Sequence, residues 1–238
     1  MDMSSNTMPV VYPKGGTKAH IPIIHQLINN YISSKAGVVR VLEGGAADRD
    51  YFRFASPVVV TGIDISAQEL ADAKYGERII GDIQTYKTDI TYDIVICWYV
   101  LEHVRDPEGA LLNLLEYTTE DGLTIIAVPN VWSLKGLITK CTPSWFHKVA
   151  RSVTLSENRD YEPFKTYLRF SISPANIVRH CSKYEIIYQG YSGFVIKGYL
   201  NWAYQFMINV LKILSLGSYR PELSEFILVI RKRRESRE

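Results

Sequence analysis

The sequence predicts an α/β domain built on a doubly wound, largely parallel sheet. From residue 38 onward, short β-branched runs alternate with helical patterns, as they do in strand–helix–strand units. The run at residues 92–97 is apolar except for Asp93, which is typical of a central strand covered on both faces. A length of 238 residues with 47% hydrophobic composition can supply one sizeable core, so a second independent domain is not expected.

Seven segments have the composition of strands. Each is a short run rich in β-branched or aromatic residues, as pleated and buried chain favours. We interpret Gly122 as closing the turn before the fifth strand and Pro129-Asn130 as ending that strand. The strands are expected at residues 38–42, 58–63, 77–81, 92–97, 123–128, 184–191 and 225–231.

Helical patterns fill the spaces between these strands. Residues 104–117 carry leucines at helical spacing, and Ser173-Pro174 begins another helix with proline in its first turn. Residues 66–75 look helical, and the stretch between the first two strands is compatible with a helix. After residue 130 the alternation breaks down, and we expect residues 131–170 to form an insertion that acts as a lid or binds a substrate.

Residues 197–217 predict an amphipathic helix. Asn201, Gln205, Asn209 and Lys212 fall on one stripe, and apolar residues cover the remainder. The segment is shorter than the roughly 20 uninterrupted apolar residues that a membrane span requires. Three roles stay open: packing on the domain or on a second copy, covering a substrate-binding site, or peripheral contact of residues 198–216 with a membrane surface.

Charge and cysteine content exclude several classes of protein. A formal net charge of +2 without a basic stripe argues against a nucleic-acid partner, and the basic run at residues 231–234 is interpreted as a solvated tail. Cys97, Cys141 and Cys181 are an odd number without paired spacing, which favours a reducing compartment over disulfides or zinc. Residues 1–8 lack the apolar core of a secretory signal, so we expect a cytoplasmic protein.

The end of the first strand carries the pattern of a cofactor site. Glu43 is followed at once by small residues, and small side chains let a backbone that opens a helix approach a ligand closely. A carboxylate suits a cationic ligand group, whereas a pyrophosphate binds bare amides at a helix N-terminus. The segment therefore favours S-adenosylmethionine over a dinucleotide, with Glu43, Gly45 and Ala47 as contacts.

Further contacts are expected after the next strands. Asp64 ends the second strand 19 residues after Gly45, near the spacing at which an acid accepts hydrogen bonds from ribose hydroxyls. Asp82 could accept from an adenine amino group, or it could be a simple turn residue. The other cofactor contacts that we expect are Ile65, Ile83 as an apolar wall, Cys97 and Trp98.

These motifs together resemble the class I S-adenosylmethionine-dependent methyltransferases. The order Val-Leu-Glu-x-Gly, Gly-Ile-Asp, Gly-Asp, Tyr-Asp-Ile-Val-Ile, Leu-Glu-His-Val and Val-Pro-Asn spans residues 38 to 130. The sequence is most similar to the group with the ubiquinone-pathway O-methyltransferases and the sugar or natural-product methyltransferases. The chain departs from the family where the usual Gly-x-Gly-x-Gly becomes Gly45-Ala-Ala-Asp-Arg49.

The resemblance implies a Rossmann-like, seven-stranded mixed sheet with its last strand antiparallel. It also implies that Glu43 lies near the methionine amine, Gly45 beneath the cofactor, Asp64 on ribose and Asp82 by adenine, while Asp93 is structural or adjacent to the cofactor. On this basis residues 1–36 are expected to be an N-terminal helical or lid segment and residues 37–238 the methyltransferase domain.

Methyl transfer to a hydroxyl needs a base, and His103 is the best candidate because a neutral imidazole accepts a proton at physiological pH. The alternative is that Glu102 and His103 only cap the following helix and order its loop. Trp98, Tyr99 and Asn130 also lie just past strands, and the aromatic cluster around His147 is a weaker acceptor candidate. No metal site is predicted, because no second carboxylate cluster accompanies Glu102.

We expect O-methylation of a small molecule such as a natural product, a sugar or a quinone-like precursor, by a monomer or a homodimer. Two alternatives stay open. A non-catalytic scaffold with this fold would explain the altered glycine loop. An NAD-linked oxidoreductase would share the acid after the second strand, but its Gly-x-Gly-x-x-Gly turn is absent.

Overall fold

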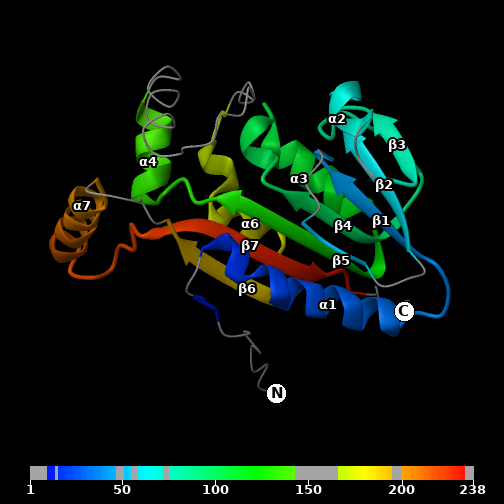
Figure 1. Ribbon diagram of the computed structural model, residues 1–238, viewed down its shortest axis with the longest axis horizontal. Helices are drawn as coiled ribbons and strands as arrows, with labels where there is room; N and C mark the ends of the chain where they lie inside the picture. The colour runs from blue at the N-terminus through cyan, green and yellow to red at the C-terminus, as the bar shows by residue number, and fades with distance from the viewer. Residues whose placement is uncertain are drawn as a thin grey trace.

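The computed structural model describes residues 10–13, 16–46, 51–54, 58–71, 75–142, 166–194 and 200–233 of the chain. Its centre is a seven-stranded sheet in the order β3-β2-β1-β4-β5-β7-β6 (Figure 1). The strands are β1 (Val39–Gly44), β2 (Val58–Asp64), β3 (Glu77–Ile80), β4 (Tyr92–Trp98), β5 (Thr118–Pro129), β6 (Glu185–Gly193) and β7 (Leu223–Arg231).

Strand direction confirms the mixed sheet predicted from the sequence. Each pair among β1 to β5 is parallel, whereas β7 is antiparallel to both β5 and β6. Parallel strands place their carboxyl ends at one edge, and the crevice outside that edge is where open α/β sheets bind ligands. The amino end of β7 lies at this same edge, because it pairs with the ends of β5 and β6.

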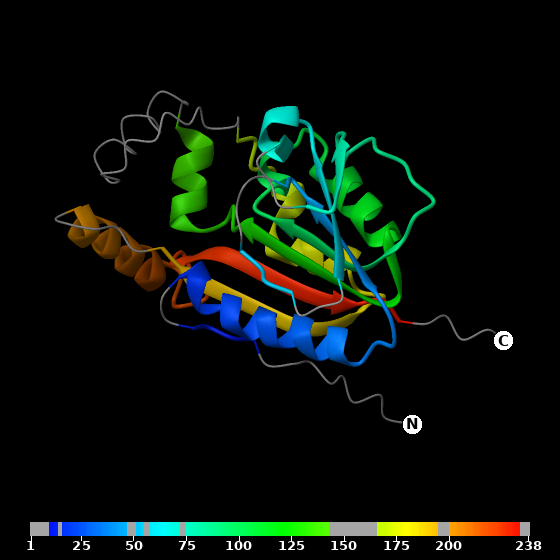
Figure 2. The same cartoon turned by 45° about the vertical axis from the view of Figure 1, so that its right-hand side comes forward.

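Alternation of side chains along the strands creates two hydrophobic cores. In β4, Val95 and Cys97 face one core, while Ile94 and Ile96 face the other. Helices α3 (Pro107–Glu116) and α6 (Pro174–His180) contribute to the first core, and α1 (Ile21–Ser33) contributes Ile24 and Ile28 to the second. Figure 2 shows α1 lying along its face of the sheet, so this helix is an integral layer of the fold.

The remaining elements are short or lie beyond the sheet. Helix α2 covers Ala67–Ala71, which is shorter than the expected helix; Tyr75 lies outside it, and residues 72–74 are outside the described chain. The described residues also include three 3-10 turns: η1 (Thr17–Ala19), η2 (Leu101–His103) and η3 (Phe170–Ile172). Helix α4 is Leu134–Cys141 and α7 is Leu200–Leu214.

The connection between β1 and β2 differs from the expectation. Its described residues, 45–46 and 51–54, contain no helix, although the stretch is compatible with one; residues 47–50 and 55–57 lie outside the described chain. Aromatic side chains occupy the space instead. Phe52 is buried, lies edge-on to Trp98 with ring centroids 5.0 Å apart, and contacts His25 at 5.6 Å.

Two other predicted boundaries are also corrected. Strand β5 begins at Thr118, so Gly122 lies within the strand and does not close a turn before it. The reason is pairing with the chain after β7: Asp121 N donates to Lys232 O at 2.7 Å, and Lys232 N donates to Gly122 O at 2.9 Å. The helix expected from residue 104 begins at Pro107, because Asp106 caps it.

Helices α4 and α7 lie side by side, away from the centre of the sheet (Figure 1). They share a small third core in which Tyr204 and Ile208 of α7 pack against Leu134 and Ile138 of α4. The apolar residues that the sequence pattern grouped on α7 therefore do not all face inward. Within the described ranges, no helix has the length and apolar character needed to cross a membrane.

The N-terminal segment lies along the outer strand of the sheet. Val11 N donates to Gln189 O, and Tyr191 N donates to Val11 O, both at 2.9 Å. These two bonds form an isolated parallel bridge between Val11 and Gly190 of β6.

Candidate functional site

The carboxyl edge of the parallel strands gathers three of the predicted cofactor residues. Glu43 is opposite Gly62 of β2 and Ile96 of β4 near the end of β1, and Asp64 is opposite Ile80 at the end of β2. Asp82 follows two residues after β3. The fold therefore places these three acids at neighbouring strand ends of one edge.

Asp64 is held in a partly buried position. Its Oδ1 accepts a hydrogen bond from Ser66 N at 2.8 Å. Burial raises the pKa of the Asp64 carboxyl, and the amides of Ser66 and Ile65 partly offset this effect. The side chain of Ile65 is 65% exposed. A hydrogen-bond acceptor beside an exposed apolar side chain suits a ribose and its attached base.

Gly45 makes a turn that requires glycine. Its φ is 71°, in the left-handed region, and its N–H donates to Ile63 O at 2.8 Å. A Cβ at this position would overlap Cγ2 of Val100 and would lie 2.8 Å from Cγ1. The backbone at Gly45 thus passes close to the side chain of Val100. Ala47 and Arg49 of the same loop are outside the described residues.

Asp82 and Ile83 take structural positions. The Asp82 carboxylate accepts from Gln84 N at 2.9 Å and from Gln84 Nε2 at 2.8 Å, which is the geometry of a turn residue. Ile83 is 4% exposed and packs in the first core. The contacts with adenine that we expected for these two residues stay predictions.

Cys97 and Trp98 point to opposite faces of β4. Cys97 is fully buried in the first core, and burial raises the pKa of its thiol. Trp98 is 6% exposed and packs in the second core against Phe52. Both side chains are therefore part of the protein interior.

His103 lies at the end of η2, close to a buried carboxylate. Its Nε2 is 3.8 Å from Oε1 of Glu102, and its Nδ1 is 3.5 Å from the hydroxyl of Thr166. The Glu102 side chain is 4% exposed, whereas that of His103 is 32% exposed. The Nε2 side of the His103 ring is thus next to a carboxylate, while the side chain is still partly exposed at the surface.

The capping alternative for Glu102 and His103 is wrong. Asp106 caps α3, because its Oδ1 accepts from Gly109 N at 3.0 Å. The loop-ordering part of that alternative has direct support: Glu102 O accepts from Tyr167 N at 2.8 Å and from Leu168 N at 3.2 Å. The motif thereby anchors the chain where it returns from the insertion.

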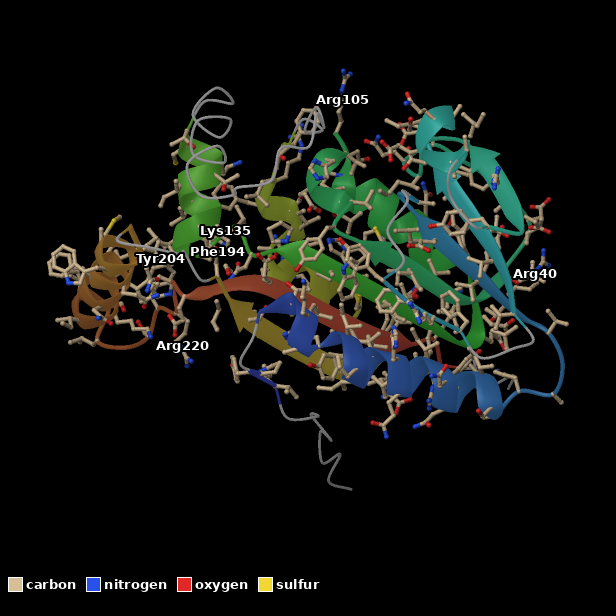
Figure 3. The ribbon with its side chains drawn as sticks, viewed as in Figure 1. Arg40, Arg105, Lys135, Phe194, Tyr204 and Arg220 are labelled. Carbon is tan, nitrogen blue, oxygen red and sulfur yellow. The ribbon has the colours of Figure 1, made fainter. Side chains whose placement is uncertain are left out.

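Three residues that the sequence analysis did not single out lie at the same edge. Thr17 Oγ1 is 2.7 Å from Tyr99 Oη, and Lys135 Nζ is 2.6 Å from Glu225 Oε1 (Figure 3 labels Lys135). Burial, followed by the charge of Glu225, raises the pKa of Tyr99. The sequence offered one signal for these residues, the acidic Glu225 at the start of an otherwise apolar strand.

Two other predicted positions are structural. Asn130 links the end of β5 to the start of β7, because its Nδ2 donates to Leu223 O at 2.7 Å. Asp93 lies at the opposite end of the sheet, where its Oδ2 accepts from Arg40 N at 2.9 Å. His147 is outside the described residues. Among the residues that are described, no three His, Cys, Asp or Glu side chains form a group that could hold a metal ion.

One protein family matches most of the chain. Residues 19–184 match the family described as a methyltransferase domain. A ubiquinone biosynthesis O-methyltransferase of Rickettsia prowazekii (strain Madrid E) is 26% identical over 122 residues, which cover 45% of this chain and 46% of that protein. The matched part thus spans about half the length of this curated relative.

Solved structures share the fold at low sequence identity. The plantazolicin methyltransferase BpumL, in complex with a triazolic desmethylPZN analog and SAH, has a TM-score of 0.54 and 14% identity, covering 92% of this chain and 86% of its own. The [4+2]-cyclase SpnF has a TM-score of 0.52 and 13% identity, covering 94% and 86%. At these identities the likeness concerns the fold alone.

Proposed function

Because the chain belongs to the class I S-adenosylmethionine-dependent methyltransferases, we propose that it methylates a hydroxyl of a small-molecule acceptor. The natural-product, sugar and quinone-like classes are all compatible with this proposal. The observation that carries it is the His103 ring beside the buried Glu102 carboxylate, just past the end of β4. Family membership also removes the oxidoreductase alternative.

The residues at the strand ends fit S-adenosylmethionine. Asp64 offers a carboxylate to ribose hydroxyls, and the exposed Ile65 offers an apolar surface to the base. Glu43 supplies a negative charge near the cationic amine, and Gly45 allows the tight turn against Val100, where no Cβ fits. When bound, the cofactor supplies a methyl group on a positively charged sulfur, ready for displacement.

His103 is proposed to remove the proton of the acceptor hydroxyl. In the neutral ring one nitrogen donates and the other accepts. In the tautomer that we propose, Nε2 carries the proton and faces Glu102 Oε1 at 3.8 Å. The proton acceptor is then Nδ1, which lies 3.5 Å from the Thr166 hydroxyl. The Glu102 carboxylate would then stabilise the cationic ring that forms, as a carboxylate does in other histidine-based sites. This orienting role explains why an acid is buried next to the histidine.

An aromatic surface supports a partly apolar acceptor. The rings of Trp132 and Phe170 lie 4.7 Å apart at the start and the return of the insertion, and their side chains are 51% and 39% exposed. The ammonium of Lys140 is 4.7 Å from the centre of the Phe170 ring. Two exposed rings, tilted by 39° to each other, with a nearby cation suit an acceptor that combines a flat apolar body with polar or anionic groups.

Formation of S-adenosylhomocysteine with a panel of hydroxylated acceptors tests this proposal. The panel contains catechols, polyprenyl phenols and sugars, and it is run with the wild type, His103→Asn and His180→Asn. His180 is the matched control, since its Nε2 is 3.2 Å from Glu108 on the α3–α6 side of the sheet. We expect turnover to fall about 100-fold or more in His103→Asn alone, with unchanged cofactor affinity by titration calorimetry.

Two results would contradict parts of the proposal. Equal turnover of both variants across pH would remove His103 from the chemistry. Methylation only of amine acceptors in a matching panel would replace the hydroxyl class. If calorimetry detects no cofactor binding, the non-catalytic scaffold becomes the better explanation.

A further inference from the structure

Helix α7 presents a second apolar face that nothing in the described chain covers. Its inner face packs through Tyr204 and Ile208 on α4. On the outer side, Trp202 and Leu214 are 75% and 76% exposed, and the rings of Trp202 and Phe206 stack at 5.9 Å. We call the outer side the α7 apolar face; it consists of Trp202, Phe206, Val210, Ile213, Leu214 and, just after the helix, Leu216.

The sequence segments that include α7 and α4 contain cations and no acids. Residues 186–221, which include α7, contain Lys197, Lys212 and Arg220 and no aspartate or glutamate. Residues 130–156, which include α4, carry Lys135, Lys140, Lys148 and Arg151, again without an acid. The 25 acidic residues of the chain thus avoid both segments.

Two carboxylates that follow α7 in the sequence offset only part of this positive charge. Glu222 lies 2.8 Å from Lys212 and 3.0 Å from Arg220, so one acid serves two cations. Glu225 pairs with Lys135. Arg220 nevertheless keeps about half of its side chain exposed, beside α7 in Figure 3. Among the described residues of α4, α7 and the turn after α7, four cations (Lys135, Lys140, Lys212 and Arg220) thus face two carboxylates, so this region combines an apolar face with an excess of positive charge.

We propose that the α7 apolar face docks this protein on the surface of an anionic phospholipid bilayer, with the helix parallel to the membrane. An interfacial helix buries apolar side chains at the boundary of headgroups and acyl chains, and aromatic residues such as Trp202 favour that depth. Lysine and arginine beside the helix add attraction to anionic headgroups. Helix α7 is long enough to lie on a membrane surface but too short to cross a bilayer.

The positive charge of this region favours an anionic bilayer over a second copy of the chain as the partner of the α7 apolar face. In a two-fold symmetric dimer the same patch meets itself. Self-association through the α7 apolar face would bring two copies of this cationic region together, and α7 itself contains no acid that could offset the repulsion. The docking does not depend on the hydroxyl acceptor or on the base assigned to His103.

Flotation of the purified full-length protein with lipid vesicles tests the proposal. One set of vesicles contains equimolar phosphatidylcholine and phosphatidylglycerol, and the other contains phosphatidylcholine alone. We expect stronger flotation with the anionic set and at least about tenfold weaker partitioning of Trp202→Ser/Ile213→Ser. Leu112→Ser is the matched control, because Leu112 is an exposed leucine on α3, at 45% exposure, and should float like the wild type.

A spectroscopic measurement covers the case in which the double variant does not fold. Brominated phosphatidylcholine in the anionic vesicles should quench tryptophan emission of the wild type, and the quenching should be largely lost in Trp202→Phe. Wild type that stays with the buffer, or equal flotation of the double variant, would overturn the proposal. A vesicle-independent dimer in analytical ultracentrifugation that Trp202→Ser/Ile213→Ser abolishes would replace the bilayer with a second copy.

Discussion

The hydroxyl of Thr17, in the turn before α1, lies 2.7 Å from the phenolic oxygen of Tyr99, directly after β4. Tyr99 has a φ of 57°, which is costly for a large side chain. Its N–H donates to Ala127 O at 2.9 Å, so both ends of the residue are fixed. The hydroxyl pair therefore ties the N-terminal segment to the strand end where the proposed site lies.

A double-mutant cycle measures this tie. Tyr99→Phe and Thr17→Val should each lower the free energy of unfolding by about 1 kcal/mol, because each removes the same partly buried hydrogen bond. The double variant should lose much less than the sum. Urea denaturation of the four proteins gives the coupling energy, and strictly additive losses would show that the two hydroxyls do not depend on each other.

Asp64→Ala should weaken binding of S-adenosylmethionine about 10- to 100-fold, the usual cost of losing hydrogen bonds to a charged group. The fold should persist, because the Asp64 side chain is only partly buried at a strand end. Titration calorimetry measures the affinity, with Asp89→Ala as the control at an exposed acid. Unchanged affinity in Asp64→Ala would withdraw the ribose contact.

Gly45→Ala should lower the free energy of unfolding by about 1–3 kcal/mol, since the new methyl overlaps Val100 and the backbone is left-handed. Adding Val100→Ala should relieve the overlap but leave the backbone strain. Chemical denaturation compares the single and double variants. If Val100→Ala gives Gly45→Ala no relief, the close approach of the two residues is not what demands glycine.

His20 should make stability depend on pH. Its side chain is fully buried with Nδ1 2.6 Å from Tyr188 Oη, and burial lowers its pKa from 6.5 to about 4. Between these values the unfolded ring binds a proton that the folded ring does not. The free energy of unfolding should therefore hold above pH 6.5 and fall as the pH drops toward 4, by up to about 1.4 kcal/mol per pH unit.

Denaturation curves of the wild type and His20→Gln across this pH range provide the check. The variant should be less stable at neutral pH and should lose less stability on acidification. Curves with identical slopes would mean that His20 is not the group responsible.

The sequence predicted the sheet well because its signal is local. A buried strand such as Tyr92–Trp98 is apolar at every position except Asp93, and recognising this pattern needs no knowledge of distant segments. The order of the acids after β1, β2 and β3 also followed from strand ends. The parallel topology then brings those ends together, so the position of the cofactor residues could be anticipated.

What the sequence could not give depends on contacts between distant segments. The β1–β2 connection lacks the expected helix in its described part, and the packing of Phe52 on Trp98 was not visible in a linear pattern. Asp106 was recognisable as a capping residue only once the start of α3 was known. Likewise, the pattern on α7 marked apolar residues without showing that Tyr204 faces α4 while Trp202 faces outward.

The bridge between Val11 and β6 has a consequence for self-association. An uncovered outer strand offers its amides and carbonyls to any other chain in extended conformation. Val11 engages the amide of Tyr191 and the carbonyl of Gln189, so the middle of β6 is capped by the protein's own leading segment. Removing that segment would leave a template for strand addition, and fibrous aggregates could then grow from molecules whose interior is still correctly packed.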